Sequence, residues 1–246
     1  MNASTYFRLV DRLPVRSLQE LTGGRPFVVL SPHPDDESLG TGGLIALARR
    51  NYQDVAVILL TDGSKSHPTS QAYPRDRLIA TRRSELLDAA RILGLPSDRL
   101  YELGLADAAP LSDDDFERSA TRIGNIVETI GAEALFVTWE HDPHCDHEAA
   151  ARLAREVRAR LPLLKLWSYP VWGWHLPASH ILTAPVPEGL RLAVSPVLSQ
   201  KRAAIEAHVS QMTNLIDDDP DGFRFDTQTL APFLRSHEHY IEVPIR

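Results

Sequence analysis

Short apolar runs alternate along this chain with longer amphipathic segments. The apolar runs predict five strands, at residues 27–32, 55–60, 100–105, 134–139 and 166–169. The amphipathic segments predict four helices, at residues 41–51, 75–93, 113–130 and 148–161. The run at 55–60 is apolar throughout, as in a strand covered on both faces. Strands that alternate with helices predict a mostly parallel, doubly wound α/β sheet.

The last third of the chain is less regular. Prolines break it into short pieces, at Pro177, Pro185, Pro187 and Pro196, which predict a small irregular lid or hairpin. One further helix is predicted at residues 198–212. Without an internal repeat or a linker, we expect a single domain over residues 1–246. Its core would cover about 25–175 and its C-terminal extension about 176–246.

Composition narrows the class of protein. The chain has 246 residues, 43% of them hydrophobic, which is enough for one sizeable core. A net charge of −7 argues against nucleic acid as a partner. A single cysteine excludes an intrachain disulfide and fits a reducing compartment. Since no signal peptide or transmembrane run is present, we expect a cytoplasmic protein, with a homo-oligomer possible.

Histidines and carboxylates are concentrated directly after two of the predicted strands. Residues 31–37 read Ser-Pro-His-Pro-Asp-Asp-Glu, and residues 141–147 read His-Asp-Pro-His-Cys-Asp-His. In an open α/β sheet, ligands bind at the carboxyl ends of the strands. Either cluster alone is explained by a polar loop or a capped helix end, but two clusters at two strand ends disfavour a purely structural account. The two clusters can converge on one metal ion.

The spacing of these residues suits a catalytic zinc site. His33, Asp36 and His147 would supply two imidazoles and one carboxylate, which leaves a coordination position for water. The same ligand set accepts Fe²⁺. Asp35 lies beside a predicted ligand and can take a proton from water whose acidity the ion raises. His144, oriented by Asp146, can donate to the oxyanion of a tetrahedral intermediate.

The two motifs resemble those of the PIG-L and LmbE-like family of zinc-dependent N-deacetylases, and the resemblance extends over about residues 25–211. It implies a Rossmann-like three-layer sandwich with the active site at the strand ends. It also implies roles for six residues: zinc ligands His33, Asp36 and His147, general base Asp35, and His144 with Asp146 at the oxyanion.

Four further residues are candidates for substrate binding. Arg82 and Asp107 match family positions that contact the substrate, although ordinary surface ion pairs explain them equally well. Trp172 and His175 lie in an aromatic segment, residues 167–175, that resembles one in bacterial members. Such aromatic side chains suit either a platform for a sugar ring or a hydrophobic core or dimer interface.

Cys145 departs from the family pattern, in which proline is frequent at this position. A thiolate is a good zinc ligand. However, on a helix the residue after His144 points about 100° away from that histidine. We therefore expect Cys145 to be a small buried residue.

The resemblance implies an enzyme that removes an N-acetyl group from an N-acetylglucosamine-type sugar conjugate, with metal-activated water and Asp35 as base. An alternative within the family is hydrolysis of a larger amide of a sugar conjugate. A different class is a Rossmann-type nucleotide-binding oxidoreductase or transferase. Residues 40–43, Gly-Thr-Gly-Gly, favour this alternative because they are rich in glycine and follow a predicted strand. The spacing argues against it, because Ile45 occupies the third glycine position of the dinucleotide-binding motif. The carrier of the acetylated sugar stays open.

Overall fold

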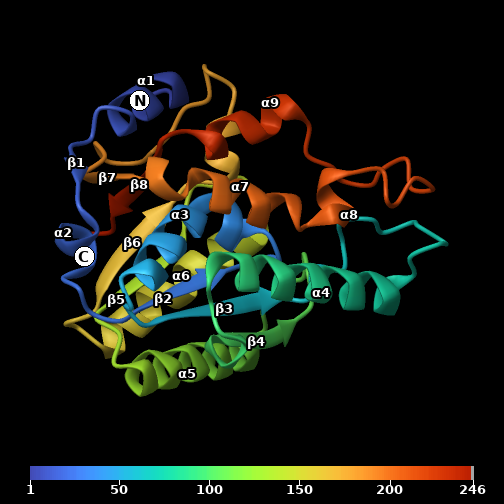
Figure 1. Cartoon of the computed structure of the whole chain (residues 1–246), viewed down its shortest axis with the longest axis horizontal. Coiled ribbons are helices and arrows are strands. Elements are labelled where there is room, and N and C mark those ends of the chain that lie inside the picture. Colours follow the sequence, from blue (N-terminus) through green and yellow to red (C-terminus); the bar gives the residue numbers. More distant parts are fainter. Residues whose placement is uncertain (245–246) are drawn as a thin grey trace.

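A sheet of eight strands runs through the computed structural model, which describes residues 1–244 (Figure 1). The order across the sheet is β1-β7-β8-β6-β5-β2-β3-β4. The strands are β1 Val15–Arg16, β2 Phe27–Ser31, β3 Val55–Thr61, β4 Leu100–Leu105, β5 Ala134–Thr138, β6 Lys165–Tyr169, β7 Gly189–Ala193 and β8 His237–Glu242. Only β8 runs antiparallel to its neighbours among these described strands. The predicted, mostly parallel α/β sheet is confirmed.

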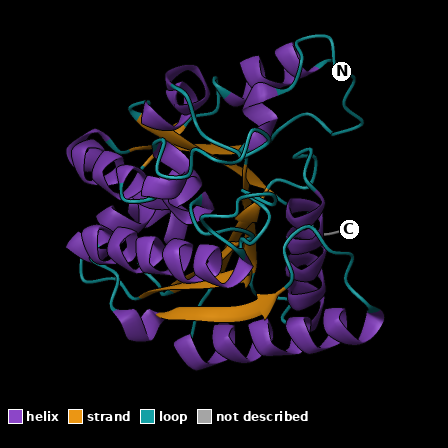
Figure 2. Cartoon of the chain, turned by 90° about the vertical axis from the view of Figure 1, so that its right-hand side faces the viewer, coloured by secondary structure: helices purple, strands orange, loops and turns teal. Residues whose placement is uncertain are grey.

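Helices cover both faces of the sheet, which Figure 2 shows close to edge-on. The α-helices are α1 Ala3–Val10, α2 Leu18–Thr22, α3 Asp36–Arg50, α4 Arg75–Leu93, α5 Asp113–Ile130, α6 Cys145–Arg160, α7 Leu198–Glu206, α8 Val209–Met212 and α9 Thr227–Leu230. Short 3-10 helices are η1 Ser97–Arg99, η2 Trp172–His175, η3 Ser195–Val197 and η4 Ala231–Leu234. Helices α3, α4 and α7 pack together on one face, and α5 packs against α6 on the other.

Strand β2 illustrates why the central strands are apolar throughout. Phe27 and Val29 point into the core beneath α3 and α4, whereas Val28 and Leu30 point into the core beneath α5 and α6. Because side chains alternate between the two faces of a strand, a strand with both faces covered needs apolar residues at every position.

Strand β2 also lies at the point where the chain reverses its direction across the sheet. From β2 the chain proceeds outward to β3 and β4 on one side, and later to β5 and β6 on the other. The parallel neighbours β2 and β5 therefore end side by side, with Leu30 in register with Val137. In open α/β sheets, such a switch point opens the crevice in which ligands bind. The two polar clusters of the sequence follow these two strands.

The five predicted strands and the four predicted helices are present, and α4, β4 and α5 have the predicted bounds. Two predicted helix starts are wrong. Helix α3 begins at Asp36 rather than at residue 41, and α6 begins at Cys145 rather than at residue 148. The glycines near residue 41 are inside the helix because the sheet approaches closely: a Cβ on Gly40 would lie 2.1 Å from Cδ2 of Tyr169. Both polar clusters thus extend into the first turn of a helix.

The C-terminal region contributes more regular structure than its prolines indicate. Strands β7 and β8 pair with each other and join the main sheet beside β6 and β1. The helix predicted at 198–212 is divided into α7 and α8 at Ala207 and His208. Since β8 lies between β6 and β7, the end of the chain is part of the same sheet as its middle. The expectation of a single domain stays a prediction.

Within residues 1–244, no helix has both the length and the apolar character that crossing a bilayer requires.

Gly40→Ala should destabilise the protein, because its Cβ would overlap the ring of Tyr169, which is fully buried and donates a hydrogen bond to the carbonyl of Leu30. Overpacking of this kind costs about 1–3 kcal/mol, measured as the free energy of unfolding in urea. Gly124→Ala is the matched control: nothing lies within 4 Å of a Cβ built there. In α5 it should stabilise by up to about 1 kcal/mol. Equal effects of the two substitutions would contradict the packing argument.

Candidate metal centre

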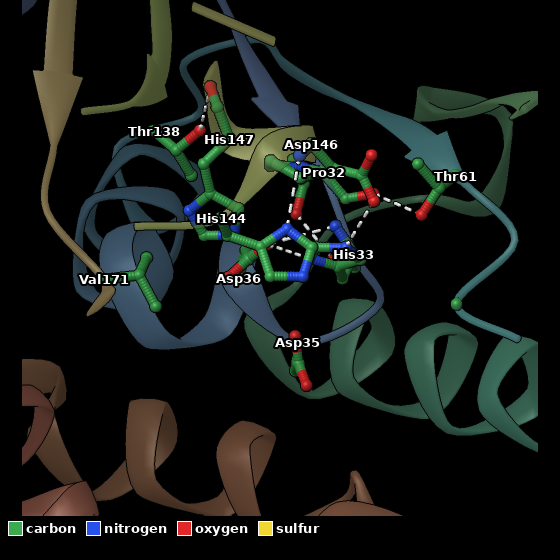
Figure 3. Close-up of polar contacts among 12 residues, drawn as sticks. Pro32, His33, Asp35, Asp36, Thr61, Thr138, His144, Asp146, His147 and Val171 are labelled. Carbon is green, nitrogen blue, oxygen red and sulfur yellow. Dashed lines mark hydrogen bonds and ion pairs between the residues drawn. The ribbon is translucent and has the colours of Figure 1, made fainter. Parts of the chain in front are cut away.

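The loops after β2 and β5 bring His33, Asp36 and His147 together at the switch point of the sheet. His33 precedes α3, Asp36 is the first residue of α3, and His147 lies in the first turn of α6. The ring centroids of His33 and His147 are 5.4 Å apart. Figure 3 shows these imidazoles grouped with that of His144 and with the carboxylates of Asp36 and Asp146. Two segments separated by more than a hundred residues thus form one cluster.

The donor atoms of this cluster converge on the Asp36 carboxylate. Its Oδ2 lies 3.2 Å from Nδ1 of His33 and 3.3 Å from Nε2 of His147. Nε2 of His147 is buried and makes no hydrogen bond to any described residue. A buried ring nitrogen without a hydrogen bond is costly unless something else coordinates it. Two imidazole nitrogens and one carboxylate oxygen are ligands that zinc takes in catalytic sites, so the residues fit the metal.

Carboxylates also support the far side of both predicted imidazole ligands. Nδ1 of His147 lies 2.9 Å from Oδ2 of Asp142, and Nε2 of His33 lies 3.0 Å from Oδ2 of Asp146. Because an ionised carboxylate only accepts hydrogen bonds, these two ring nitrogens carry the protons. The opposite ring nitrogens face the Asp36 carboxylate and are the atoms that would bind a metal after losing their protons. Such carboxylate–histidine pairs orient metal ligands and raise their basicity.

The electrostatics of the cluster favour positive charge at its centre. Burial alone would lower the pKa of His147, but the charges of Asp36 and Asp142 raise it to about 9. Burial works in the opposite direction on Asp36, yet the two imidazoles bring its pKa well below the usual range. Asp36 therefore stays ionised inside the protein, and the site attracts a cation.

Asp35 is held in a strained backbone conformation at the start of α3. Its φ angle is +145°, which non-glycine residues rarely adopt. Its main-chain N–H donates to Oε2 of Glu37, and a guanidinium N–H of Arg82 donates to its Oδ2 at 3.1 Å. Burial raises the pKa of Asp35 to about 6, with the nearby charge of Arg82 opposing the shift. Strain of this kind persists where surrounding contacts impose it, often at functional sites.

A histidine from the C-terminal region supports that conformation. His208 lies at the break between α7 and α8, and its Nε2 is 3.2 Å from Oε1 of Glu37. Both residues are 1% exposed. His208 thus helps to fix the carboxylate that accepts the N–H of Asp35, together with the hydroxyl of Ser38, which donates to the same oxygen at 2.6 Å. The sequence resemblance covered this helix without giving the histidine a role.

The imidazole of His144 is held by a hydrogen bond at one of its two ring nitrogens. Its Nδ1 accepts the main-chain N–H of Asp146 at 3.2 Å, as the cap of α6. Burial and the neighbouring imidazoles of His33 and His147 lower the pKa of His144. A neutral ring that accepts at Nδ1 carries its proton on Nε2. Asp146 does orient His144, but through its main chain, since its carboxylate contacts His33 and the N–H of Ala108.

Comparison with known proteins identifies the family of this chain. The model of one protein family, "PIG-L: GlcNAc-PI de-N-acetylase", matches residues 28–158, which is more than half of the chain. The chain belongs to the PIG-L family. The matched region contains both polar clusters and the strands that carry them.

Two relatives and one solved structure illustrate the family. The "Probable N-acetyl-alpha-D-glucosaminyl L-malate deacetylase 2" of Bacillus subtilis is 33% identical over 50% of this chain and 55% of that protein. The "1D-myo-inositol 2-acetamido-2-deoxy-alpha-D-glucopyranoside deacetylase" of Mycolicibacterium smegmatis is 26% identical over 86% of this chain and 87% of that protein. The structure of N,N'-diacetylchitobiose deacetylase from Pyrococcus horikoshii superposes with a TM-score of 0.67 over 89% of this chain and 84% of its own, at 22% identity. This last similarity concerns the fold.

A polar cavity of about 210 Å³ opens onto the cluster of this PIG-L family member. It is lined by His33, Asp35, Asp36, Lys65, Ser66, Arg82, Asp107, His144, Trp172, Gln211 and Phe223. His147 and Asp146 lie behind this lining, whereas His175 lies outside it, in an adjoining hollow.

The four predicted substrate-binding residues differ in how far other protein groups already occupy their side chains. The guanidinium of Arg82 already donates to Gly63, to Pro34 and to Asp35, so it primarily positions the last of these. Asp107 accepts the N–H of Lys65 and lies 3.4 Å from His33. Trp172 stacks on Phe225 at the cavity wall. Its indole is partly exposed and available to a ligand.

Sequence reasoning missed some residues of the centre and misjudged one. The hydrogen bond from His147 to Asp142 was not predicted, although Asp142 lies in the same polar cluster of the sequence, five residues before that histidine. The contact between Glu37 and His208 was likewise not predicted. Cys145 is exposed, so the prediction of a buried residue is wrong. As the first residue of α6, after the cap His144, it faces solvent at the helix end, and Sγ lies 3.8 Å from Oδ1 of Asp146.

His147→Ala should abolish stoichiometric zinc binding, because it removes one of three predicted ligands. Asp142→Asn keeps the side-chain shape but loses the charge behind His147, and should weaken zinc affinity by about 10–100-fold. Competition with a fluorescent chelator measures both affinities. His237→Ala removes an imidazole outside the centre and should bind zinc as the wild type does. Unchanged affinity in His147→Ala would refute its role as a ligand.

His208→Leu should lower kcat by about tenfold, which corresponds to about 1.4 kcal/mol, while zinc content and KM stay close to wild type. The expected cause is a shifted Asp35, since Glu37 loses one of the two donors to its Oε1 and keeps only Ser38. His208→Gln retains a donor and should recover part of kcat. Ser210→Ala is the matched control, because it removes equally buried hydrogen bonds in the same segment, one donated to Glu85 and one accepted from Gln211. A similar loss of kcat in Ser210→Ala would indicate a general structural effect.

Proposed function

We propose that this protein is a metal-dependent hydrolase that removes the N-acetyl group from an N-acetylglucosamine-type conjugate and releases a free amine and acetate. The observation that carries the proposal is the convergence of a two-histidine, one-aspartate donor set with a buried carboxylate, Asp35, and a neutral imidazole, His144, on one polar cavity. The names of the relatives support the same chemistry on malate and inositol conjugates of the acetylated sugar.

His33, Asp36 and His147 would hold the metal, with Zn²⁺ as the expected ion and Fe²⁺ as an alternative for the same ligands. When bound there, such an ion supplies a Lewis acid for the amide carbonyl and raises the acidity of water.

Asp35 acts as the general base. Arg82 holds Oδ2, which leaves Oδ1 to accept a proton from the attacking water. A pKa raised to about 6 by burial keeps the carboxylate mostly ionised at neutral pH and makes it a stronger base than an exposed aspartate. The water oxygen bonds to the acyl carbon, and the amide C–N bond breaks. The proton on Asp35 then passes to the departing nitrogen, which leaves as the amine.

His144 stabilises the charge that develops on the carbonyl oxygen. Its Nδ1 is occupied by the N–H of Asp146, so Nε2–H is the donor. A fixed donor of this kind contributes more in the transition state than in the ground state, because the oxygen gains negative charge as water attacks. His144 serves this purpose as a neutral ring, in agreement with its lowered pKa.

The rest of the polar cavity suits a sugar ring. Lys65, Asp107 and Gln211 provide hydrogen-bonding groups on its wall, and Trp172 provides an aromatic face. The glycines at residues 40–43 do not suit a nucleotide, because Gly40 packs on Tyr169 and the N–H of Gly43 donates to Glu238. A phosphate could not approach that backbone. Hydrolysis of a larger amide would use the same residues and differs only in the space needed for the acyl group.

Asp35→Asn should retain one equivalent of zinc and lose about 10²–10⁴ in kcat, the usual contribution of a general base. Acetate release from N-acetylglucosamine and its conjugates, measured with and without a chelator, gives the activity, and elemental analysis gives the metal content. Asp88→Asn changes an exposed carboxylate of α4 and should behave as wild type. Loss of zinc from Asp35→Asn would identify Asp35 as a ligand, and unchanged turnover would remove it from the reaction.

A further inference from the structure

A second hollow adjoins the polar cavity of the metal centre. Its volume is about 390 Å³, compared with about 210 Å³ for the polar cavity. His144 and Trp172 line both, so the two spaces meet at these two rings. We call this second space the aglycone groove. Its remaining lining residues are Pro143, His175, Leu176, Pro177 and His180.

The two spaces differ sharply in charge. The polar cavity contains ionisable side chains of both signs, among them Asp35, Asp107, Lys65 and Arg82. No carboxylate, lysine or arginine is among the residues that line the aglycone groove. Burial lowers the pKa of His175, which keeps that ring neutral at neutral pH. Prolines, a leucine, an indole and imidazoles offer apolar or flat surfaces. Such a lining suits a neutral group with an apolar or aromatic face.

Size indicates that a ligand uses both spaces. Pockets for small molecules usually measure about 300–1,000 Å³. The polar cavity alone falls below that range, whereas the two spaces together fall within it. A substrate larger than one acetylated sugar therefore has to extend beyond the polar cavity, and the groove offers room beside His144.

The chemistry of an acetylated amino sugar places its aglycone near this junction. The amide nitrogen is on C2, and the glycosidic oxygen is on the adjacent carbon, C1. If His144 donates to the amide carbonyl, the substituent on C1 leaves the sugar within a few bonds of that imidazole. We propose that the groove binds the aglycone of the conjugate, and that this aglycone is uncharged and apolar or aromatic. The proposal rests on the deacetylase function proposed above.

The lining argues against an anionic aglycone such as malate. Two carboxylates placed in the groove would gain no lysine or arginine partner from its lining, whereas an apolar or aromatic aglycone would pack on Leu176, the prolines and the indole. The relative from Bacillus subtilis is named for a malate conjugate. The present chain, by contrast, should select a different class of conjugate with the same catalytic residues.

The test compares kcat/KM for acetate release from N-acetylglucosamine, its 4-nitrophenyl glycosides and its malate glycoside, with the zinc-loaded enzyme. The aryl glycoside of one anomer should exceed the malate glycoside by at least about tenfold, or about 1.4 kcal/mol. A malate glycoside that is as good as the aryl glycosides would overturn the proposal. Activity on none of the substrates would overturn the deacetylase function itself, so the two failures are distinguishable.

Substitutions in the groove give an independent readout. Leu176→Arg and His180→Arg should each shift the ratio of kcat/KM for malate over aryl glycoside by at least fivefold in favour of malate. His180 is exposed, so its replacement keeps the test valid if Leu176→Arg fails to fold. Leu163→Arg is the matched control, since Leu163 is 96% exposed and lines a hollow between α5 and α6 that contains no residue of the centre.

In Leu163→Arg, the ratio of kcat/KM for the malate glycoside over the aryl glycoside should equal that of the wild type. If the groove variants change every substrate by the same factor, the groove does not contact the aglycone. A selective loss of activity on N-hexanoylglucosamine, with the glycoside ratio unchanged, would instead assign the groove to the acyl chain and overturn the proposal.

Discussion

The structure of the centre depends on carboxylates that are paired with imidazoles inside the protein. The pairs lie at the ends of β2 and β5. Among the described strands, this is the one place where two neighbouring parallel strands lead away in opposite directions across the sheet. Asp36 and His147 are at most 2% exposed, and both would be costly to bury alone. Each has a partner of complementary charge, and Asp142 and Asp146 extend the pairing outward. The arrangement concentrates carboxylates around the ring nitrogens of His33 and His147. A divalent cation is the species that such a site accommodates best.

The backbone around this cluster is held by contacts from distant parts of the chain. The φ angle of +145° at Asp35 costs about 1–3 kcal/mol. Hydrogen bonds to charged groups contribute about 1.5–3 kcal/mol each, and Asp35 has such contacts from Glu37 and Arg82. These contacts therefore suffice to hold the strained conformation. Glu37 is held in turn by His208 and by the hydroxyl of Ser38, so the break between α7 and α8 contributes to the conformation of Asp35 although it lies far from β2 in sequence.

Much of this could be predicted from sequence because the relevant signals are local. The apolar runs of β2, β3 and β5 show the strands, and the two polar clusters at their ends identify the centre. The start of α3 could not be predicted, because the glycines that suggested a helix start are needed where Tyr169 approaches the helix. Strand β8 was missed for a similar reason. Its histidines and glutamates look solvent-exposed in sequence, yet Glu238 is buried against Lys201 and Tyr240. Contacts between distant segments leave no local pattern.

The residues proposed for catalysis and those proposed for specificity are separated in the same way. The residues to which we assign catalysis lie at the ends of buried strands, where packing on both faces fixes their positions. The residues proposed to face the rest of a substrate lie on η2 and the segment after it, which follow β6 at the same edge of the sheet. Asp142 connects the two sets: its Oδ2 supports His147 and also accepts the N–H groups of Val171 and Trp172. One buried carboxylate therefore fixes both a predicted metal ligand and the start of the specificity segment. If the groove binds the aglycone as proposed, residues beyond Asp142 can change to suit a new aglycone while the contacts of His147 stay the same.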